Sequence, residues 1–261
     1  MHTRIFQLDA FTRRRFSGNP AAVMPLEAFP SGDVLQAIAA ENNLSETAFL
    51  VGGNGVYQLR WFTPKVEVPL CGHATLASAA VVLEKLEPQR AAVTFHTASG
   101  ALHVTRAADG YAMDFPARPT VAAGASDALI RALGALPQEV RADAINYLVV
   151  LDSERAVRGL APDIAAIAAL DRQGVIITAQ GDGEYDCVSR YFTPARGVAE
   201  DPVTGSAHCA LAPYWSERLG KAQLRAYQAS RRGGEMTCRV SGERVELEGA
   251  CVFYLEGDAE I

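Results

Sequence analysis

The sequence is poor in cysteine and has no long hydrophobic run, and each shortage excludes a class of protein. Its five cysteines are widely spaced, include no Cys-x-x-Cys pair and match no zinc-finger spacing, so we expect reduced thiols in an intracellular protein. No apolar run approaches the ~18 residues of a membrane-spanning helix, and the first residues lack the features of a signal peptide. We therefore expect a soluble, cytoplasmic protein without a membrane partner.

An excess of positive charge is also missing, which argues against nucleic acid as a partner. The formal net charge is −6, and a negatively charged chain does not suit a phosphate backbone. The two arginine clusters, residues 13–15 and 231–232, are too short to follow a duplex. We therefore expect a small molecule as the partner.

A five-residue pattern occurs twice, half a chain apart. Residues 60–64 read Arg-Trp-Phe-Thr-Pro, and residues 190–194 read Arg-Tyr-Phe-Thr-Pro. Each string precedes a short loop and a glycine, Gly72 or Gly205, that opens an apolar helical pattern. The same strand, loop and helix start in both halves indicates an internal repeat.

Each repeat has the features of an anion-binding unit. The strand should end at Thr-Pro, because proline lacks the donor that a central strand needs. The helix start that follows has unpaired N–H groups and the positive end of the helix dipole, which together suit a carboxylate. Two such ends would form a small acid-binding cleft between the halves.

Length and hydrophobic periodicity predict two domains of similar content. A chain of 261 residues is long enough for two cores. We predict domains at residues 1–116 and 117–250, with 251–261 as a last strand that packs back on the first domain. We expect the linker at 116–124, which is rich in Pro, Ala and Gly.

Alternating apolar side chains and β-branched residues predict the strands, and longer periodic segments predict the helices. The predicted strands are 4–9, 21–24, 47–51, 58–63, 92–96, 102–106, 112–115, 145–151, 175–179, 187–193, 223–229, 237–240, 244–247 and 251–255. The predicted helices are 31–41, 72–86, 126–133, 164–170 and 205–219. The helices at 72 and 205 are apolar on almost every side, so we expect each to be enclosed by its own sheet.

Four segments resemble signature segments of the PhzF-like (phenazine biosynthesis) family, in the family's order. They are residues 16–23 (Phe-Ser-Gly-Asn-Pro-Ala-Ala-Val), 43–49 (Asn-Leu-Ser-Glu-Thr-Ala-Phe), 71–75 (Cys-Gly-His-Ala-Thr) and 200–208 (Glu-Asp-Pro-Val-Thr-Gly-Ser-Ala-His). This family is similar to diaminopimelate epimerase. The resemblance implies an α+β fold of two pseudo-symmetric domains, each a curled, mostly antiparallel sheet around a central helix. It also implies a homodimer and an isomerase without cofactor or metal.

The resemblance further implies which residues act. Glu46 matches the glutamate that moves a proton between carbons, and His73, Asp201 and Ser206 match residues that hold or polarise the substrate in the same cleft. The residues expected to bind substrate are Asn19, Gly72, Thr204 and Gly205. Glu200 is interpreted as a surface charge.

The chemistry expected of Glu46 agrees with this resemblance. A base that removes a proton next to a carboxylate needs a raised pKa, which burial in a dry cleft provides. The same glutamate can return the proton elsewhere on the substrate, which gives isomerisation. The expected substrate is a small carboxylate such as trans-2,3-dihydro-3-hydroxyanthranilate.

Three other functions stay open. An amino-acid racemase or epimerase would use Cys71, although the second half has Asp201 and Pro202 where a second thiol would stand, and Cys209 fits a buried apolar position. A metal-bound hydrolase would use His73, His208 and Asp201, whose spacing matches no known ligand motif. A non-catalytic binding protein could have kept the fold.

Overall fold

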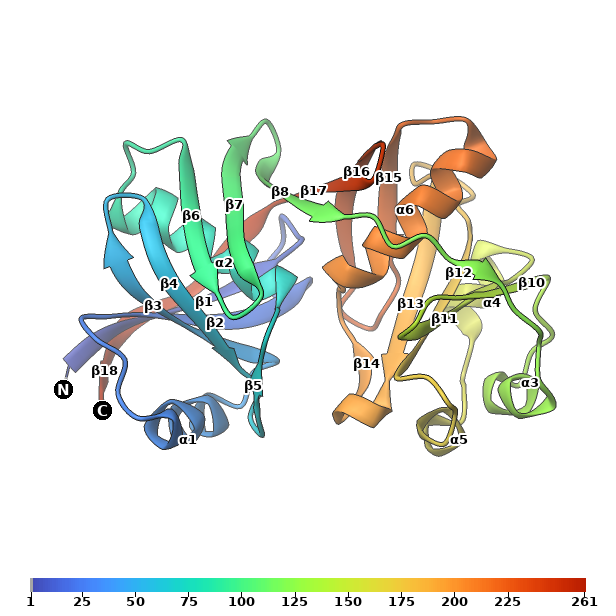
Figure 1. The fold of residues 1–261 in the computed structure, drawn as a ribbon, viewed down its shortest axis with the longest axis horizontal. Helices are drawn as coiled ribbons and strands as arrows, with labels where there is room; N and C mark the ends of the chain where they lie inside the picture. The colour runs from blue at the N-terminus through green and yellow to red at the C-terminus, as the bar shows by residue number, and fades with distance from the viewer. Residues whose placement is uncertain (1) are drawn as a thin grey trace. The chain divides into compact units, whose positions relative to one another are not determined.

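The computed structural model describes residues 2–261, which form two compact units. Unit 1 runs to Asp114 and also contains Glu248–Ile261, whereas unit 2 is the continuous stretch Phe115–Leu247. Unit 1 is therefore built from both ends of the chain. In Figure 1 its strands are blue to green, except for the red strand β18.

The sheet of unit 1 has the strand order β18-β1-β2-β3-β4-β6-β7-β8, with β5 beside the end of β4. The pairs β2–β3 and β4–β6 are parallel, and the other pairs are antiparallel. The strands are β1 (His2–Ala10), β2 (Asn19–Leu26), β3 (Glu46–Gly53), β4 (Val56–Phe62), β5 (Glu67–Val68), β6 (Ala92–Thr97), β7 (Gly100–Ala107), β8 (Gly110–Pro116) and β18 (Cys251–Glu260).

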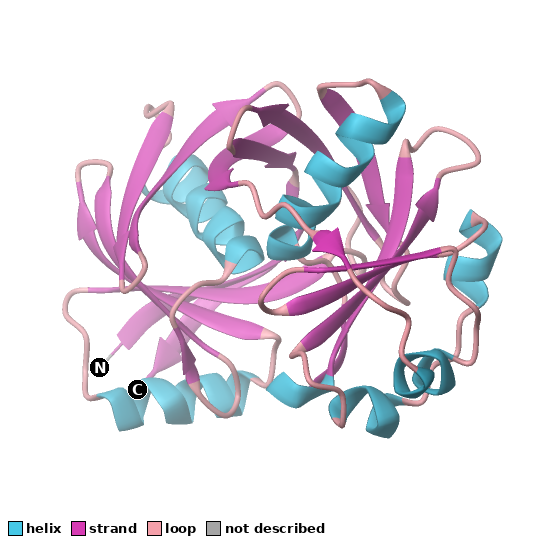
Figure 2. Cartoon of the chain, turned by 45° about the vertical axis from the view of Figure 1, so that its right-hand side comes forward, coloured by secondary structure: helices cyan, strands magenta, loops and turns pink. Residues whose placement is uncertain are grey.

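Helix α2 (Gly72–Val81) forms the centre of unit 1. Every residue from its second position onward is buried, and it contacts β1, β2, β3 and β18. A helix that is apolar on all sides needs cover on all sides, and the sheet provides it by curling (Figure 2). The chain continues from α2 into a π-helical segment, Val82–Leu86. Helix α1 (Gly32–Asn42) packs Leu35 and Ala39 into a second apolar cluster of the unit.

Unit 2 repeats this arrangement. Its sheet has the order β9-β10-β11-β12-β13-β15-β16, with β14 beside β13. The pairs β11–β12 and β13–β15 are parallel, which matches β2–β3 and β4–β6 of unit 1. The strands are β9 (Val121–Ala122), β10 (Glu139–Ala142), β11 (Asn146–Val150), β12 (Gly174–Gln180), β13 (Cys187–Thr193), β14 (Val198–Asp201), β15 (Gln223–Gln228), β16 (Gly234–Ser241) and β17 (Arg244–Gly249).

Helix α6 (Gly205–Leu219) takes the place of α2 in unit 2. Most of its side chains are buried, and it packs against β15 and β16. Its smaller helices are α3 (Asp127–Leu133), α4 (Glu154–Gly159), α5 (Ile164–Ala168) and the 3-10 turn Pro194–Arg196. Each unit is therefore a curled, mixed sheet around one central helix, which confirms the α+β fold and the repeat.

Some predicted boundaries differ from the structure. The segment 116–124 is more than a linker, because Val121–Ala122 forms β9 and pairs with β10. The helix predicted at 72–86 changes to π-helical geometry at Val82. The strands β5, β9, β10 and β14 and helix α4 were not predicted; β5 and β9 have only two residues each, too few for a periodic pattern.

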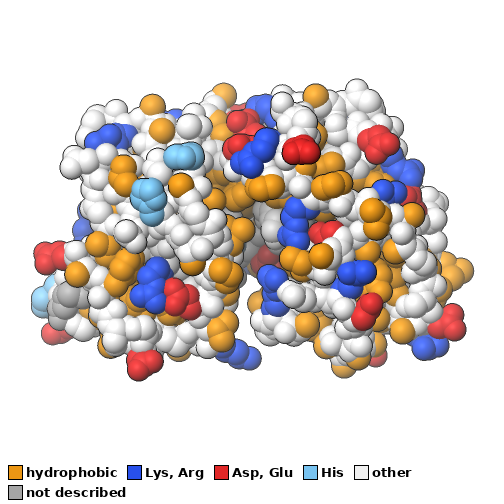
Figure 3. Space-filling model, in the orientation of Figure 1, with side chains coloured by type: hydrophobic (Ala, Val, Ile, Leu, Met, Phe, Trp, Pro, Cys, Tyr) orange, Lys and Arg blue, Asp and Glu red, His pale blue; other side chains and the backbone are white. Residues whose placement is uncertain are grey.

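The surface carries charges of both signs. On the face drawn in Figure 3, Lys and Arg side chains are interspersed with Asp and Glu side chains among hydrophobic and uncharged ones. Within residues 2–261, no helix is both long and apolar enough to cross a membrane.

Candidate active site

Glu46 stands at the first position of β3, directly after a tight connection from α1. Helix α1 ends at Asn43, which adopts a left-handed conformation with φ of 48° and donates its N–H to the carbonyl of Ala39. Three residues later the chain enters β3, where Glu46 pairs with Ala21 of the parallel strand β2. The register of two buried strands therefore fixes the backbone of Glu46.

Cys71 and His73 come from the start of α2. Cys71 is the N-cap residue in an extended conformation, and its carbonyl accepts bonds from the N–H of Thr75 at 3.1 Å and from the Thr75 hydroxyl at 2.5 Å. Gly72 is the first helical residue, and His73 follows it. These two hydrogen bonds to the Cys71 carbonyl hold the turn in one conformation.

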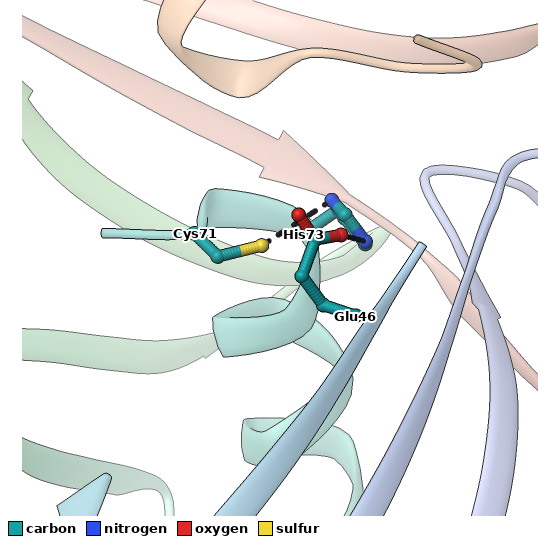
Figure 4. Close-up of side chains that lie close together, drawn as sticks. All are labelled: Glu46, Cys71 and His73. Atoms are coloured by element: carbon teal, nitrogen blue, oxygen red, sulfur yellow. Dashed lines mark hydrogen bonds and ion pairs between the residues drawn. The ribbon is translucent and has the colours of Figure 1, made fainter. Parts of the chain in front are cut away.

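The three side chains form a largely buried cluster (Figure 4), and their ligand atoms lie within 4.8 Å of one another. Nδ1 of His73 is 3.5 Å from Sγ of Cys71, and Nε2 is 3.0 Å from Oε2 of Glu46. The Nε2–Oε2 contact has the distance of an ion pair but not the alignment of a hydrogen bond. The Glu46 side chain is 17% exposed, so it is the member of the cluster that solvent reaches most.

The charges in this cluster follow from burial and proximity. Burial disfavours a charged imidazole, but neighbouring Cys71 and Glu46 outweigh it, and the pKa of His73 lies well above its usual value. Burial, and then the Glu46 carboxylate, raise the pKa of the Cys71 thiol. At neutral pH the cluster is therefore an imidazolium next to Glu46 and a neutral thiol, and Cys71 is a poor base.

Asn19 lies on the same face of the sheet as Glu46. It is fully buried at the start of β2, two residues before Ala21, which pairs with Glu46. The preceding Gly18 has φ of +67°, and a Cβ there would lie 2.2 Å from the carbonyl oxygen of Ala10. The turn itself therefore requires glycine at position 18.

Asp9 anchors the loop before Asn19 and was not anticipated from the sequence. It is 2% exposed, and its carboxylate accepts the N–H of Phe16 at 2.7 Å. An acidic residue between the apolar residues Leu8 and Ala10 near the end of β1 was the available signal.

In unit 2, Asp201, Thr204 and Gln228 form one polar network. The Thr204 hydroxyl donates to the Asp201 carboxylate. The Gln228 side chain accepts the N–H of Thr204 at 2.9 Å and donates to the carbonyl of Asp201 at 2.7 Å. Gln228 is almost fully buried at the end of β15, and sequence analysis missed it. The network fixes the loop between β14 and α6.

The start of α6 presents the other predicted residues of unit 2. Thr204 is its N-cap, Gly205 is buried, and Ser206 is exposed at the second helical position. Ser206 therefore has the access to solvent that a substrate contact needs.

His208 has a structural role. Its Nδ1 donates to the carbonyl of Thr204 at 2.8 Å, and burial lowers its pKa to about 4. Within residues 2–261, the cluster of metal-ligating side-chain types is Glu46, Cys71 and His73, whose ligand atoms lie within 4.8 Å of one another. The set His73, His208 and Asp201 is not such a cluster.

The arginine of each repeated string holds a glutamate on the next short strand. Arg60 binds Glu67 of β5 through two contacts of 2.7 Å. Arg190 binds Glu200 of β14 at 2.7 and 3.0 Å and also donates to the carbonyl of Leu160 at 2.6 Å. Glu200, interpreted as a surface charge, is 22% exposed and is held next to Asp201 by this bidentate partner.

Comparison with known proteins covers both units. The chain matches the family model described as "Phenazine biosynthesis-like protein" over residues 8–257. It is 52% identical to an uncharacterized isomerase of Pseudomonas aeruginosa, with 98% of each chain covered. A crystal structure of a PhzF family protein from Enterococcus faecalis is similar over 100% of both chains, with a TM-score of 0.97 and 43% identity.

A more distant structure extends the likeness in fold. A predicted epimerase of Pseudomonas aeruginosa has a TM-score of 0.76 at 23% identity over 98% of this chain and 99% of its own. This supports the epimerase-like fold alone. The family match and the near relatives show that the chain belongs to the phenazine biosynthesis-like (PhzF) family and is an isomerase.

Proposed function

We propose that the chain isomerises a small carboxylate-bearing metabolite by proton transfer through Glu46, without a cofactor. The observation that supports this most directly is the 3.0 Å contact between Glu46 and a cationic His73 at a nearly buried position. The proposed substrate is trans-2,3-dihydro-3-hydroxyanthranilate or a related compound.

The arrangement of Glu46 suits both halves of a proton transfer. His73 holds Oε2, so the second carboxylate oxygen can take a proton from a substrate carbon. The carbon–hydrogen bond breaks, a carboxyl O–H bond forms, and the substrate electrons shift into the neighbouring double bond. The carboxyl group then returns the proton to another carbon, so no electron acceptor is needed.

We propose that the other residues bind the same substrate. The N–H groups at the start of α6 suit its carboxylate, and Thr204, Gly205 and the exposed Ser206 would contact it there. Asp201, held by Thr204, would accept a substrate N–H or O–H group. In unit 1, Asn19 and Gly72 would also bind substrate.

Cys71 is a poor candidate for the alternative, a two-thiol racemase. Burial raises the pKa of its thiol, so the reactive thiolate is scarce. The residue at the matching N-cap of α6 is Thr204, which carries no thiol. These two observations favour Glu46 as the base.

Deuterium incorporation tests the proposal. The enzyme and its Glu46→Gln and Cys71→Ser variants would be incubated in deuterated water with the cyclic substrate, and separately with amino acids including diaminopimelate. We expect Glu46→Gln to lose about 100- to 10,000-fold in rate, since a general base contributes that much. Cys71→Ser should stay within about tenfold of the wild type, because a neutral thiol contributes little to base catalysis.

The opposite pattern would refute the proposal. If an amino acid exchanges its α-proton in Glu46→Gln but not in Cys71→Ser, the enzyme is a thiol-dependent racemase. We also propose a homodimer, and sedimentation equilibrium would reveal a monomer if this is wrong.

A further inference from the structure

We propose that Cys71, His73 and Glu46 bind a soft divalent cation, Zn²⁺ above all, and that the bound ion inhibits the enzyme. Binding of the ion does not depend on the proposed function. Inhibition rests on it, because the ion would occupy the acid–base residues.

The distance between the two donor atoms fits one shared ion. Zn²⁺ binds sulfur at about 2.3 Å and imidazole nitrogen at about 2.0–2.1 Å, and a tetrahedral angle between these bonds separates the donors by about 3.6 Å. Sγ of Cys71 and Nδ1 of His73 are 3.5 Å apart. The ion can therefore bind without a change in the backbone at the start of α2.

Glu46 supplies a third donor beside these two. Its carboxylate, Sγ of Cys71 and a ring nitrogen of His73 lie within 4.8 Å of one another (Figure 4). Carboxylate oxygen binds Zn²⁺ at about 2.0–2.2 Å, so all three side chains can contribute to one site. Water or a small anion would take the remaining coordination position.

The exchange balances in charge. One divalent ion replaces the thiol proton of Cys71 and one proton of the His73 imidazolium, and both protons leave to solvent. No electrons are transferred. The sum of charges on Glu46, Cys71, His73 and the ion is the same before and after, so binding adds no net charge to a site in which Cys71 and His73 are 7% and 5% exposed.

The second cysteine of unit 1 has no imidazole beside it. Cys251 lines a hollow of about 450 Å³ whose charged lining residues are Arg13, Arg106, Glu84 and Asp109, with no histidine among the described residues that line it. It therefore provides a matched control thiol in the same unit.

Titration of the purified full-length protein with Zn²⁺ and Co²⁺ tests the proposal. Calorimetry would give the Zn²⁺ affinity and stoichiometry, and the sulfur-to-cobalt absorption band would report a thiolate ligand. We expect one ion per chain in the wild type and in Cys251→Ser, and loss of the band in Cys71→Ser. Glu46→Gln, which lacks the carboxylate donor, should bind the ion more weakly than the wild type.

Several outcomes would overturn the proposal. They are a cobalt band that persists in Cys71→Ser, a band that disappears in Cys251→Ser, or no saturable Zn²⁺ binding by wild type whose circular dichroism is that of folded protein. His73→Ala, which keeps the thiol, should also lose the site, and this guards against misfolding of a single variant.

The inhibitory part has its own readout. Zn²⁺ should inhibit isomerisation with a midpoint equal to its dissociation constant, and a chelator should restore activity. Binding without inhibition would refute that part alone. Absence of any isomerase activity would refute the proposed function and leave the binding result standing.

Discussion

The central helices of the two units begin with the same framework. Cys71 caps α2 and Thr204 caps α6, and in each case the residue four positions later donates its side chain to the cap carbonyl. Thr75 does this with a hydroxyl, and His208 does it with an imidazole. In both units, therefore, the side chain of the fourth residue after the N-cap donates to the N-cap carbonyl, although the residue type differs.

The second helical position shows where the units diverge. His73 is buried and charged beside Glu46, whereas Ser206 is exposed and neutral. The same cap is present in both units, and under the proposed function the side chain at the second position supports acid–base chemistry in unit 1 and substrate binding in unit 2. Specialisation of a repeated fold thus needs few substitutions.

Substitution of the side chain at the second helical position should give the largest effect, which is on catalysis. His73→Gln leaves the Glu46 carboxylate without its cationic partner, so the proposed base loses the group that holds it. We expect kcat/KM to fall about 100-fold or more, the usual contribution of a positioned acid–base group. Ser206→Ala should instead raise KM with a smaller change in kcat. Steady-state kinetics of both variants would compare their kcat and KM values. Equal effects on kcat would contradict different roles for His73 and Ser206.

Substitution of His208, the fourth residue after the N-cap of α6, should give the next largest effect, which is on stability in acid. The pKa of His208 is about 4 in the folded chain against a usual 6.5, so its contribution to stability is present above pH ~6.5 and is lost as pH falls toward 4. The shift corresponds to about 3 kcal/mol, since one pKa unit equals 1.36 kcal/mol. Urea denaturation between pH 7 and 4 should show a shallower loss in His208→Gln than in the wild type. Parallel pH profiles would contradict this role.

The two arginine–glutamate pairs should give the smallest effects and differ from each other. The Arg190 side chain is 13% exposed and binds a carbonyl as well as Glu200, while Arg60 is 31% exposed. We expect Arg190→Lys to cost about 1–3 kcal/mol, the value of lost bonds to a charged group. Arg60→Lys should cost about 0–1 kcal/mol, as is usual for exposed pairs. Denaturant melts of both variants would test this, and equal losses would show that burial does not separate the pairs.

The sequence was sufficient where a signal was local or repeated. The central helices could be predicted because they are apolar on every side, and the repeat because Arg60 and Arg190 start the same string. Glu46 and His73 could also be named as candidate site residues, because both stand in the family motifs. Their 3.0 Å contact depends on the register of β3 against β2 and on the turn at Cys71, which no local pattern encodes.

The missed residues share a different property. Gln228 supports Thr204 from 24 positions away, and the contact exists only because β15 pairs with β13. The partner of Glu200 was missed because it lies on the preceding strand. Alignment of the two repeats would have helped here, because a glutamate on the next short strand follows the arginine in both units. Glu67 on β5 follows Arg60, as Glu200 on β14 follows Arg190. Long-range strand pairing therefore limits what periodicity can reveal.

The return of β18 to β1 also affects how the protein is made. Domains generally fold as units during synthesis, with the N-terminal one first. In this chain unit 2 is continuous, whereas β1 obtains its neighbour β18 only when the final segment leaves the ribosome. The order of completion is thus reversed: the first half to be synthesised is the last to close. A nascent chain stopped before Glu248 would display an unpaired β1 edge, which makes this interval the one in which a chaperone is most useful.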